Sequence, residues 1–475
     1  MCSLLLLLPL FGIIVLNLLF RNLMRKLALP FVLALSALQV ILVLYRPAQI
    51  LNAPEYWQRF FKLPLFLDNL TLVLLLSIGI VVFCAVLVGE QTISNLKQRF
   101  NFLNLILVSM IGMNGTVLTQ DIFSLYVFLE ITAVSSFILI ALQRNLNAME
   151  GAFKYIILSA VATIMLLASI ALLLLVAGDT SFAGVSAAIA DSSQSPLVLL
   201  AMAIFVCGLF IKGGLVPFHG WLPAAYSAAP AGVSVLLAGI VTKVSGIYAL
   251  IRLATSVFGS NASVNQVLMI AGAISIVIGA FAAIGQNDFK RMLAYSSISQ
   301  VGYIVLALGC GTKLAIVGAV FHLFNHSIFK SLLFVNSAAV EQQLGTTDMN
   351  KMGALGSKMP ITNITSLIAF LSTAGVPPLA GFWSKLIIVI ALWQSAYYFY
   401  AYLAIILGVV TLAYLLLMQR KVFFGIPAAN QDSVKEGGFG IVLPALILAA
   451  ITLGVGIFFP FLFNSFIIPI ESFLK

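Results

Sequence analysis

Charged residues are scarce in this chain. Lys, Arg, Asp and Glu make up 8% of its 475 residues, whereas hydrophobic residues make up 62% and the mean hydropathy is +1.16. Soluble domains are about 45–50% apolar and about 25% charged, so this composition excludes an ordinary water-soluble protein. The 24 basic residues are spread along the chain, and the net charge of +10 therefore predicts no nucleic-acid partner.

Cysteine is scarce too. The four cysteines are Cys2, Cys84, Cys207 and Cys310, and no CxxC or Cys/His spacing joins them. Zinc, iron–sulfur and haem sites need ligands at short, regular spacings, so the sequence predicts neither a metal site nor a cofactor in this chain. Apolar and polar residues do not alternate with a period of two between turn signals, which excludes an outer-membrane β-barrel.

The chain instead has a series of long apolar runs. A helix of about 20 residues crosses a hydrocarbon core of about 30 Å. Runs bounded by charges, Gly and Pro predict an all-α polytopic membrane protein with about fourteen transmembrane helices. The predicted helices cover 3–20, 27–45, 66–89, 101–119, 122–142, 151–177, 196–218, 229–254, 265–286, 293–310, 312–340, 361–393, 396–418 and 439–465. The first run lacks a basic leader and a cleavage pattern, so we interpret it as a helix rather than a signal peptide.

The distribution of Lys and Arg predicts the orientation of these helices. Four of these residues lie within apolar runs, and the other twenty are assigned to loops. Fourteen follow odd-numbered helices: Arg21, Arg25, Lys26, Lys97, Arg99, Arg144, Lys154, Lys290, Arg291, Lys351, Lys358, Arg420, Lys421 and Lys435. Six lie on the opposite side: Arg46, Arg59, Lys62, Arg252, Lys313 and Lys475. Cytoplasmic loops are usually the more basic ones. We therefore expect a multi-pass protein of the cell membrane, surrounded by the lipid bilayer, with both termini on the non-cytoplasmic side.

Two of the predicted helices carry the same interruption. The pattern G-x-x-P-x-x-G-aromatic occurs at 214–221 and again 161 positions later at 375–382. The residues expected to break the helices are Gly214, Pro217, Pro377 and Pro378. Pro removes a backbone donor and clashes with the preceding turn, while Gly loosens the backbone. Paired broken segments in corresponding halves indicate a transporter built from repeats, with its site near the membrane midplane.

Several ionisable side chains fall inside the apolar runs. They are Glu130, Lys212, Lys243, His322, His326, Lys330 and Lys385. An ionisable group at bilayer depth costs about 2.5–3.5 kcal/mol on insertion scales, so each needs a partner, a wet cavity or a changed protonation state. Together these side chains predict a path for charge through the membrane.

Glu130 and Lys212 are the expected ion pair. Lys212 lies two positions before Gly214, where a helix break frees backbone carbonyls, and Glu130 would exchange its proton as this partner changes. One alternative is a neutral Glu130 bonded to a serine or to the backbone, and another is a Lys212 that snorkels to the surface. Lys243 is also expected to be buried, and a proton would reach it only through water or a polar side chain.

His322, His326 and Lys330 follow one another at i, i+4 and i+8, which places them along one helix face. Imidazoles both give and take protons near neutral pH, so this row suits a relay between the earlier lysines and Lys385. A metal site is a rival interpretation, but it lacks a clear third ligand, and Lys330 would repel a cation. Histidines that bond Ser or Asn to hold helices together are another alternative. For His219, the sequence favours a role in a structural hydrogen bond at least as much as a role in proton uptake.

At these residues the chain resembles the antiporter-like membrane subunits of complex I, which also occur in membrane-bound hydrogenases and in multisubunit sodium/proton antiporters. The resemblance covers roughly residues 65–420. Its motifs are Phe128-Leu-Glu130; Ile211-Lys212-x-x-x-Val-Pro-x-His219-x-Trp-Leu-Pro223; Ser234-Val-Leu-Leu-Ala-Gly-Ile-Val-Thr-Lys243; Lys290-Arg-Met-Leu-Ala-Tyr-Ser-Ser-Ile-Ser-Gln-Val-Gly302; Phe321-His-Leu-x-x-His326-x-x-x-Lys330; and Gly375-Val-Pro-Pro-Leu-x-Gly-Phe-x-x-Lys385.

The resemblance implies a division of the chain into two inverted five-helix repeats. Helices one to three would cover 1–100, and a first half-channel repeat of helices four to eight would cover 101–255. A second half-channel repeat of helices nine to thirteen would cover 265–420, and 421–475 would hold a loop and helix fourteen. The chain has no long arm after helix fourteen, so it does not resemble the distal subunit that bears a lateral helix.

The resemblance also implies roles for the buried charges. Glu130 would pair with Lys212, and Lys243 together with the two histidines would connect the half-channels. Lys385 would face the exit or the next subunit, and it matches the members of the family that carry lysine at this position.

We therefore expect a subunit that translocates protons, or Na⁺, within a redox-driven respiratory membrane complex, next to other antiporter-like membrane subunits. It would bind no electron carrier, so any oxidoreductase activity would belong to the complex. The main alternative is a subunit of a multisubunit sodium/proton antiporter without a redox arm. A scaffold subunit would tolerate loss of Lys212 and Lys385, and a stand-alone solute carrier lacks an evident substrate pocket. Proton is the default for Lys and His chemistry, whereas sodium prefers oxygen ligands.

Overall fold

The computed structural model describes residues 2–18, 21–45, 64–192, 195–259, 261–426 and 433–463, with the side chains of 21–26 excepted. Within these ranges the chain is helical and has no strand, only isolated bridges. The predicted all-α fold is therefore confirmed. The last two residues of the predicted helix 439–465, and the loop cations Arg46, Arg59, Lys62 and Lys475, lie outside the described residues.

Twelve segments of the described chain are long and apolar enough to cross a membrane. They are α2 (Arg21–Tyr45), α5 (Asn69–Thr92), α6 (Leu96–Leu118), α7 (Ile122–Ile140), α8 (Leu146–Ala177), α10 (Pro196–Gly213), the continuous segment Ala231–Ser256, α14 (Ala262–Ile284), α15 (Phe289–Cys310), α16 (Lys313–Leu344), α19 (Tyr398–Gln419) and α20 (Phe439–Ile457). The shorter α1 (Cys2–Leu18) and the pair α17 (Pro360–Ala374) and α18 (Ala380–Gln394) account for the remaining two of the fourteen expected segments.

The continuous segment and the connections contain further elements. The segment comprises α12 (Ala231–Leu236), the π-helices η2 (Leu237–Val241) and η3 (Lys243–Tyr248), and α13 (Ala249–Ser256). The connections hold η1 (Ala141–Gln143), α9 (Phe182–Asp191), α11 (Trp221–Ala228), η4 (Met349–Lys351), η5 (Leu355–Ser357), the π-helix η6 (Arg420–Phe424) and α21 (Phe459–Leu462). Neither α9 nor the π-helices were expected from the apolar pattern.

Three helices begin four or five residues before the predicted start because a polar residue caps them. Asn95, Asn145 and Asp288 are the N-caps of α6, α8 and α15, and each side chain accepts a hydrogen bond from a backbone N–H of the first turn. Helix starts inferred from the first apolar residue are therefore too late. As a result Arg99 and Lys290, which the sequence placed among the loop cations, lie on helices.

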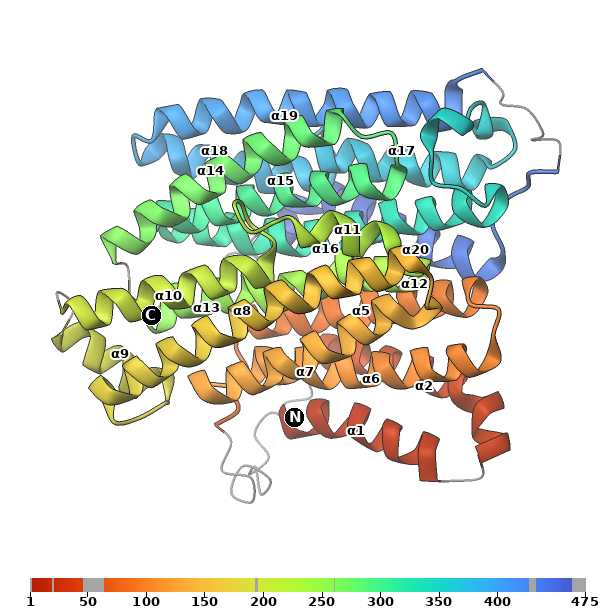
Figure 1. The fold of residues 1–475 in the computed structure, drawn as a ribbon. Helices are drawn as coiled ribbons and strands as arrows, with labels where there is room; N and C mark the ends of the chain where they lie inside the picture. Colours follow the sequence, from red (N-terminus) through yellow and green to blue (C-terminus); the bar gives the residue numbers. More distant parts are fainter. Residues whose placement is uncertain are drawn as a thin grey trace.

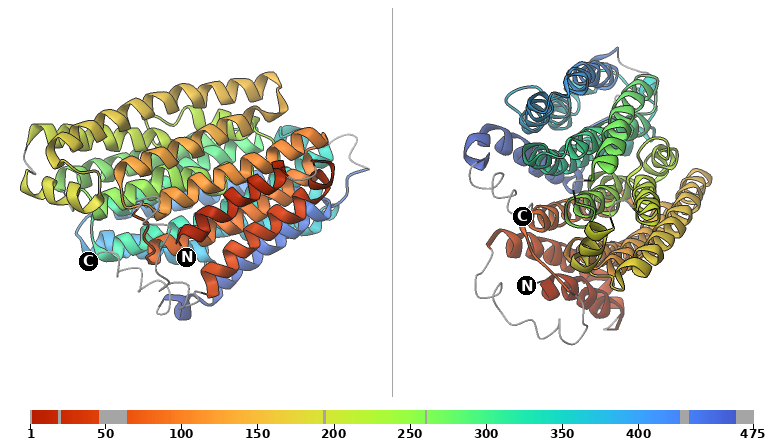
Figure 2. Two further views of the ribbon diagram at one scale, coloured as in Figure 1. Left: turned by 90° about the horizontal axis from the view of Figure 1, so that it is seen from below. Right: turned by 90° about the vertical axis from the view of Figure 1, so that its left-hand side faces the viewer.

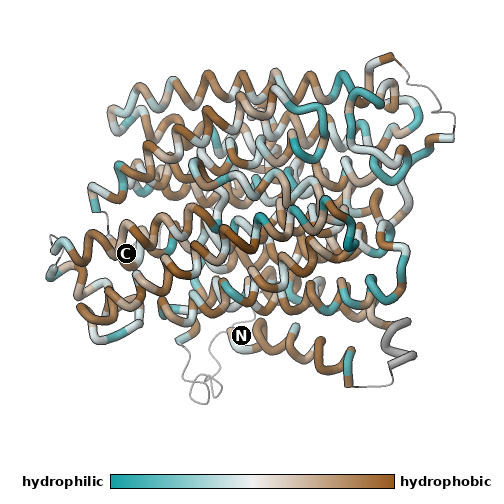
Figure 3. The backbone as a smooth tube through the Cα atoms, in the orientation of Figure 1, coloured by the Kyte–Doolittle hydropathy of each residue, from teal (hydrophilic) through white to brown (hydrophobic). Residues whose placement is uncertain are grey.

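The transmembrane helices lie side by side in one elongated bundle. Figure 1 shows them running across the view, and Figure 2 shows most of them end-on, with the N-terminal helices and α19 at opposite ends of the bundle. Figure 3 shows hydrophobic residues along the helices and hydrophilic ones concentrated near the helix ends. This distribution is the one that a bilayer around the bundle requires.

The two halves repeat the same local connections. Asp121 caps α7 and accepts a hydrogen bond from the hydroxyl of Thr180, while Asp288 caps α15 and accepts one from the hydroxyl of Thr347. Asp288 follows Asp121 by 167 positions, and Thr347 follows Thr180 by the same number. The isolated bridges of Asp121 with Ser181 and of Asp288 with Asp348 repeat with the same separation, and α8 and α16 are both 32 residues long.

Both predicted helix breaks are present. α10 ends at Gly214 with φ +67°, and α17 ends at Gly375 with φ +88°, left-handed conformations that glycine adopts without a Cβ penalty. The chain resumes as α11 and α18 after the prolines. The Val216–Pro217 and Pro377–Pro378 peptide bonds are both cis.

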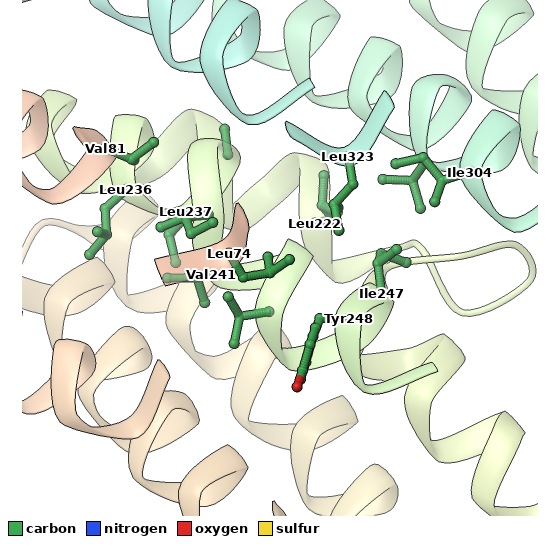
Figure 4. Close-up of a cluster of buried hydrophobic side chains, with 14 of the residues drawn as sticks. Leu74, Val81, Leu222, Leu236, Leu237, Val241, Ile247, Tyr248, Ile304 and Leu323 are labelled. Atoms are coloured by element: carbon green, nitrogen blue, oxygen red, sulfur yellow. The ribbon is translucent and has the colours of Figure 1, made fainter. Parts of the chain in front are cut away.

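An apolar core joins the halves. Figure 4 shows part of it, where Leu74 and Val81 of α5 lie near side chains of α12, η2 and η3, with Leu323 of α16 and Ile304 of α15 close by. α16 packs against α5, α12, α15, α17, α18 and α20, so it lies at the centre of the bundle. Polar side chains on α16 are consequently held away from lipid.

Candidate functional site

Glu130 and Lys212 form a salt bridge between α7 and α10. The Lys212 Nζ lies 2.8 Å from Glu130 Oε1 and donates a further hydrogen bond of 2.9 Å to Ser159 Oγ of α8. Thr163, one turn further along α8, donates a 2.7 Å hydrogen bond to the same carboxylate oxygen. The Lys212 side chain is fully buried and that of Glu130 is 26% exposed, so three helices enclose an ion pair that keeps one partly open side.

Aromatic packing holds the broken helix that carries Lys212. Trp221, the first residue of α11, donates its indole N–H to the carbonyl of Ile211 at 3.0 Å, across the break. Its ring stacks on Tyr155 of α8, with ring centroids 4.3 Å apart. The Ile211 carbonyl also accepts a hydrogen bond from the Gly214 N–H at 3.2 Å, and the two bonds together fix the turn that bears the lysine.

Lys243 lies at the start of the π-helix η3 and is fully buried. Its ammonium donates a hydrogen bond to the carbonyl of Ala238, five residues earlier in the same segment. The backbone of η3 meets α10 at a pair of glycines, because a Cβ placed on Gly246 would lie 2.2 Å from the Cα of Gly213. The helix bearing Lys243 is therefore in direct backbone contact with the residue after Lys212. π-Helical turns occur frequently at functional sites.

The three predicted side chains of α16 are all fully buried. The rings of His322 and His326 are parallel, with centroids 6.2 Å apart. His322 Nδ1 shares a 2.8 Å hydrogen bond with Ser384 Oγ of α18, whereas neither ring nitrogen of His326 has a hydrogen-bond partner among the described residues. Lys330 donates to Ser296 Oγ of α15 at 2.7 Å.

The charges around His326 come from both halves. It lies near enough to Lys243, Lys330 and Lys385 for the charge of each to act on it. Lys330 is in turn within electrostatic reach of Lys243 and Lys385. The helix that carries this row packs against η2, which precedes Lys243, and against α18, which bears Lys385.

Lys385 binds the end of the second broken helix. Its ammonium donates to the carbonyls of Thr373 and Ala374, at 2.8 and 3.3 Å, which belong to the last turn of α17. A helix C-terminus carries about half a negative charge, so it stabilises a cation there. The Nζ also lies 4.7 Å from the centre of the Tyr303 ring, within the range of a cation–π contact.

The two histidines of α16 have no metal-binding partners in the described part of the chain. No group of three or more His, Cys, Asp or Glu side chains there could hold a metal ion. His219, the third histidine, is partly exposed in the connection between α10 and α11, with its ring centroid 6.4 Å from that of Tyr295.

Two further buried cations escaped sequence reasoning. Arg252 of α13 was assigned to a loop, but it is 3% exposed and binds both carboxylate oxygens of Asp68, at 2.6 and 2.9 Å. Lys290 of α15 is 1% exposed and lies 2.6 Å from a carboxylate oxygen of Glu341 on α16. Both lie near the ends of apolar runs, where a sequence pattern does not separate loop charges from buried ones.

The fold and this axis of buried charge define a polytopic membrane subunit with paired broken helices. Residues 119–411 match the model of the family described as NADH:quinone oxidoreductase/Mrp antiporter, TM. The chain is 32% identical over 401 residues to a Na(+)/H(+) antiporter subunit of Alkalihalophilus pseudofirmus, covering 84% of this chain and 81% of the relative. It is 35% identical over 382 residues to an NADH-quinone oxidoreductase subunit of Desulforudis audaxviator, covering 78% and 76% of the two chains.

A solved structure agrees with these relatives. A chain of the membrane-bound sulfane sulfur reductase, an archaeal respiratory membrane complex, superposes with a TM-score of 0.88 and 28% identity, over 100% of this chain and 97% of that one. The protein described here belongs to the NADH:quinone oxidoreductase/Mrp antiporter transmembrane family, as the motifs predicted.

Proposed function

We propose that this chain translocates protons, or Na⁺, as an antiporter-like subunit of a larger membrane complex. The observation that carries this proposal is the Glu130–Lys212 ion pair, followed by Lys243, the α16 side chains and Lys385, all inside a membrane bundle. Ionisable groups at this depth are costly to insert, and they mark ion pathways in membrane proteins. Two broken helices next to Lys212 and Lys385 support the same conclusion.

The mechanism is electrostatic. A push on Glu130 from outside the subunit weakens its contact with Lys212, and the lysine then releases a proton toward Lys243. His326 of the second half takes up the proton next, because its two buried ring nitrogens have no hydrogen-bond partner among the described residues. Transfer past His322 brings the proton to Lys385 and the exit or the next subunit.

Two kinds of complex fit the site. The leading proposal is a redox-driven respiratory complex, which the match to an NADH-quinone oxidoreductase subunit and to the sulfane sulfur reductase supports. The second is a multisubunit sodium/proton antiporter without a redox arm, which the match to the Na(+)/H(+) antiporter relative supports. The proteins that purify with this chain distinguish them, because only the first predicts iron–sulfur proteins among its neighbours.

The same proposal includes an orientation and a division into units. Both termini face away from the cytoplasm in the cell membrane, since loops after odd-numbered helices carry most of the Lys and Arg residues. Burial removes one cation from each side of this count, Lys290 from the basic side and Arg252 from the other, so the bias remains. Residues 101–255 and 265–420 form the two half-channels, and neighbouring membrane subunits pack alongside them.

Replacement of Glu130 by Gln tests the mechanism. Glu130→Gln keeps the shape and a hydrogen bond to Thr163 but removes the charge that holds Lys212. We expect coupled ion translocation by the intact complex in proteoliposomes to be abolished while the complex still assembles. Glu150→Gln is the matched control, because Glu150 forms an exposed ion pair with Lys154 on the surface of α8.

The scaffold alternative makes the opposite prediction. If the chain only connects other subunits, Glu130→Gln and Glu150→Gln transport equally well, and the number of ions moved per turnover stays unchanged. That result would overturn the proposed function, provided that both variants assemble to the same extent.

A further inference from the structure

A large groove opens on the surface of the first half, away from the buried charge axis. It has a volume of about 1050 Å³ and is walled by α1, α6, α7 and α8. Its lining divides into two parts: polar and basic side chains at the helix ends, and apolar side chains along the helices. This division matches the two parts of a phospholipid.

The polar part of the groove carries positive charge without a compensating carboxylate. Lys97 and Arg144 both line it, and neither forms a salt bridge among the described residues. The nearest acids in sequence are already neutralised: Glu90 binds Arg99 at 2.5 Å, and Glu150 binds Lys154 at 2.5 Å. A ligand with a negative charge is therefore favoured here.

Amide side chains complete the polar part. Asn95, Gln98, Asn101 and Asn104 of the α6 region line the groove together with Asn17 of α1. Asn17 donates a 2.6 Å hydrogen bond to Asn104, which ties α1 to α6 at the groove floor. Amides donate hydrogen bonds to phosphate and glycerol oxygens as readily as to each other.

The apolar part of the groove includes side chains that the rest of the described chain leaves partly uncovered. Phe153 is 63% exposed, Ile138 44% and Ile156 39%, and all three line the groove. Phe137 and Leu105 form its partly buried wall. Hydrocarbon chains are the natural cover for such side chains within the membrane.

We propose that this groove is a binding site for an anionic phospholipid, with the headgroup at Lys97 and Arg144 and the acyl chains along α7 and α8. Basic pockets between transmembrane helices bind anionic headgroups. A neighbouring membrane subunit would cover the apolar wall equally well, but it would need acidic side chains to meet the two cations. The lipid supplies negative charge and hydrocarbon in one molecule.

The groove also adjoins the support of the Glu130–Lys212 pair. Phe137, in its wall, packs edge-on against Tyr155, whose other face stacks on Trp221. Trp221 in turn holds the broken helix that carries Lys212. A bound lipid therefore lies one aromatic ring from the stack that positions the lysine.

Photo-crosslinking with an anionic lipid tests this site. The intact complex is reconstituted into phosphatidylcholine vesicles that contain a photoreactive phosphatidylglycerol, and the labelled peptides are mapped. We expect labelling near Phe153 and Ile156. The double variant Lys97→Gln/Arg144→Gln should reduce this labelling about tenfold, because it removes the two cations that bind the headgroup. Arg420→Gln/Lys421→Gln removes one Arg and one Lys from the exposed end of α19 and η6 and should leave that labelling unchanged.

Additional variants and competitors show whether the labelling comes from a lipid bound in the groove. Ile156→Trp fills the acyl part while keeping both cations, and it should also reduce labelling. Unlabelled phosphatidylglycerol should compete, whereas phosphatidylcholine and inorganic phosphate should not. Equal labelling of the double variant and its control overturns the proposal. So does equal competition by phosphatidylcholine, or disulfide trapping of Phe153→Cys to a neighbouring subunit in the assembled complex.

Discussion

The two halves of the bundle share a scaffold but differ in charge. In the first half, the ammonium of Lys212 binds Glu130 and Ser159, and Thr163 binds the same Glu130 carboxylate. The positions 167 residues further on hold Ser297, His326 and Lys330. The helix break at Gly214 recurs at Gly375. Lys212 lies two positions before the first break, and Thr373 lies two positions before the second, so Thr373 corresponds to the lysine. The carboxylate and the lysine of the first half thus correspond to two hydroxyls in the second. The two hydroxyls of the first half, Ser159 and Thr163, correspond to an imidazole and a cation.

This difference separates two tasks. The first half binds its lysine with a full negative charge, so an outside charge can open or close the pair. The second half binds Lys330 and Lys385 with hydroxyl and carbonyl oxygens, and the described residues show no carboxylate bound to either. A lysine without a carboxylate partner is not locked in an ion pair, and in the proposed mechanism its proton is the one that moves on.

The largest effect is expected when the first half loses its cation. Lys212→Ala leaves Glu130 with only Thr163 as a partner, and breaking a buried ion pair costs about 3–5 kcal/mol. We expect transport in proteoliposomes to fall by about 100-fold or more. Lys154→Ala, which removes an exposed lysine from α8, is the control. Equal transport by the two variants would contradict the role of the pair.

The second half should be sensitive to proton release rather than to charge alone. Lys385→Arg keeps a cation beside the α17 carbonyls, but a guanidinium does not give up its proton. We expect Lys385→Arg and Lys385→Ala to lower transport about tenfold each, because a proton-transfer group is lost in both. Lys313→Arg, at an exposed position, should transport normally. Normal transport by Lys385→Arg would show that Lys385 supplies only positive charge.

A carboxylate introduced into the second half should make it more like the first. Ser296 Oγ lies 2.7 Å from the Lys330 Nζ, so Ser296→Asp places an anion within reach of the ammonium. The fixed pair should retain its proton and slow transport about threefold. Ser296→Ala, which removes the hydrogen bonds to Lys330 and Tyr414 but adds no charge, should cost less. Pre-steady-state uptake of protons into vesicles measures the difference. Faster transport by Ser296→Asp would contradict loose proton binding in this half.

The smallest effect concerns the scaffold that the halves share. Asp121 and Asp288 cap α7 and α15 in the same way, and each binds a threonine from the facing connection. Asp121→Ala and Asp288→Ala should each lower stability by about 1 kcal/mol and by the same amount. Thermal unfolding of the purified complex followed by intrinsic fluorescence measures this. Clearly unequal losses would show that the correspondence between the halves does not extend to their caps.

Much of the fold followed from apolar length, because a membrane span leaves little freedom in composition. The breaks at Gly214 and Gly375 were predictable since Gly and Pro act locally on the backbone. The π-helical turns around Lys243 were not, because they depend on how that segment packs between α5, α10 and α16.

The charged residues also divide into those that the sequence identifies as buried and those whose burial only the packed structure shows. Glu130 and Lys212 stood out because each lies far from the ends of its apolar run. Arg252 and Lys290 lie near such ends, where burial is decided by a partner from a distant helix, Asp68 or Glu341. Only the packed structure brings those partners together.

The contact between Gly213 and Gly246 brings together the two segments that carry Lys212 and Lys243. Lys212 and Lys243 belong to different segments, and the distance between those segments is limited by two residues that have no side chain. Even a methyl group at Gly246 would force the backbones apart. In the proposed path, the step from the ion pair to Lys243 thus depends in part on glycine, a residue that itself carries no proton.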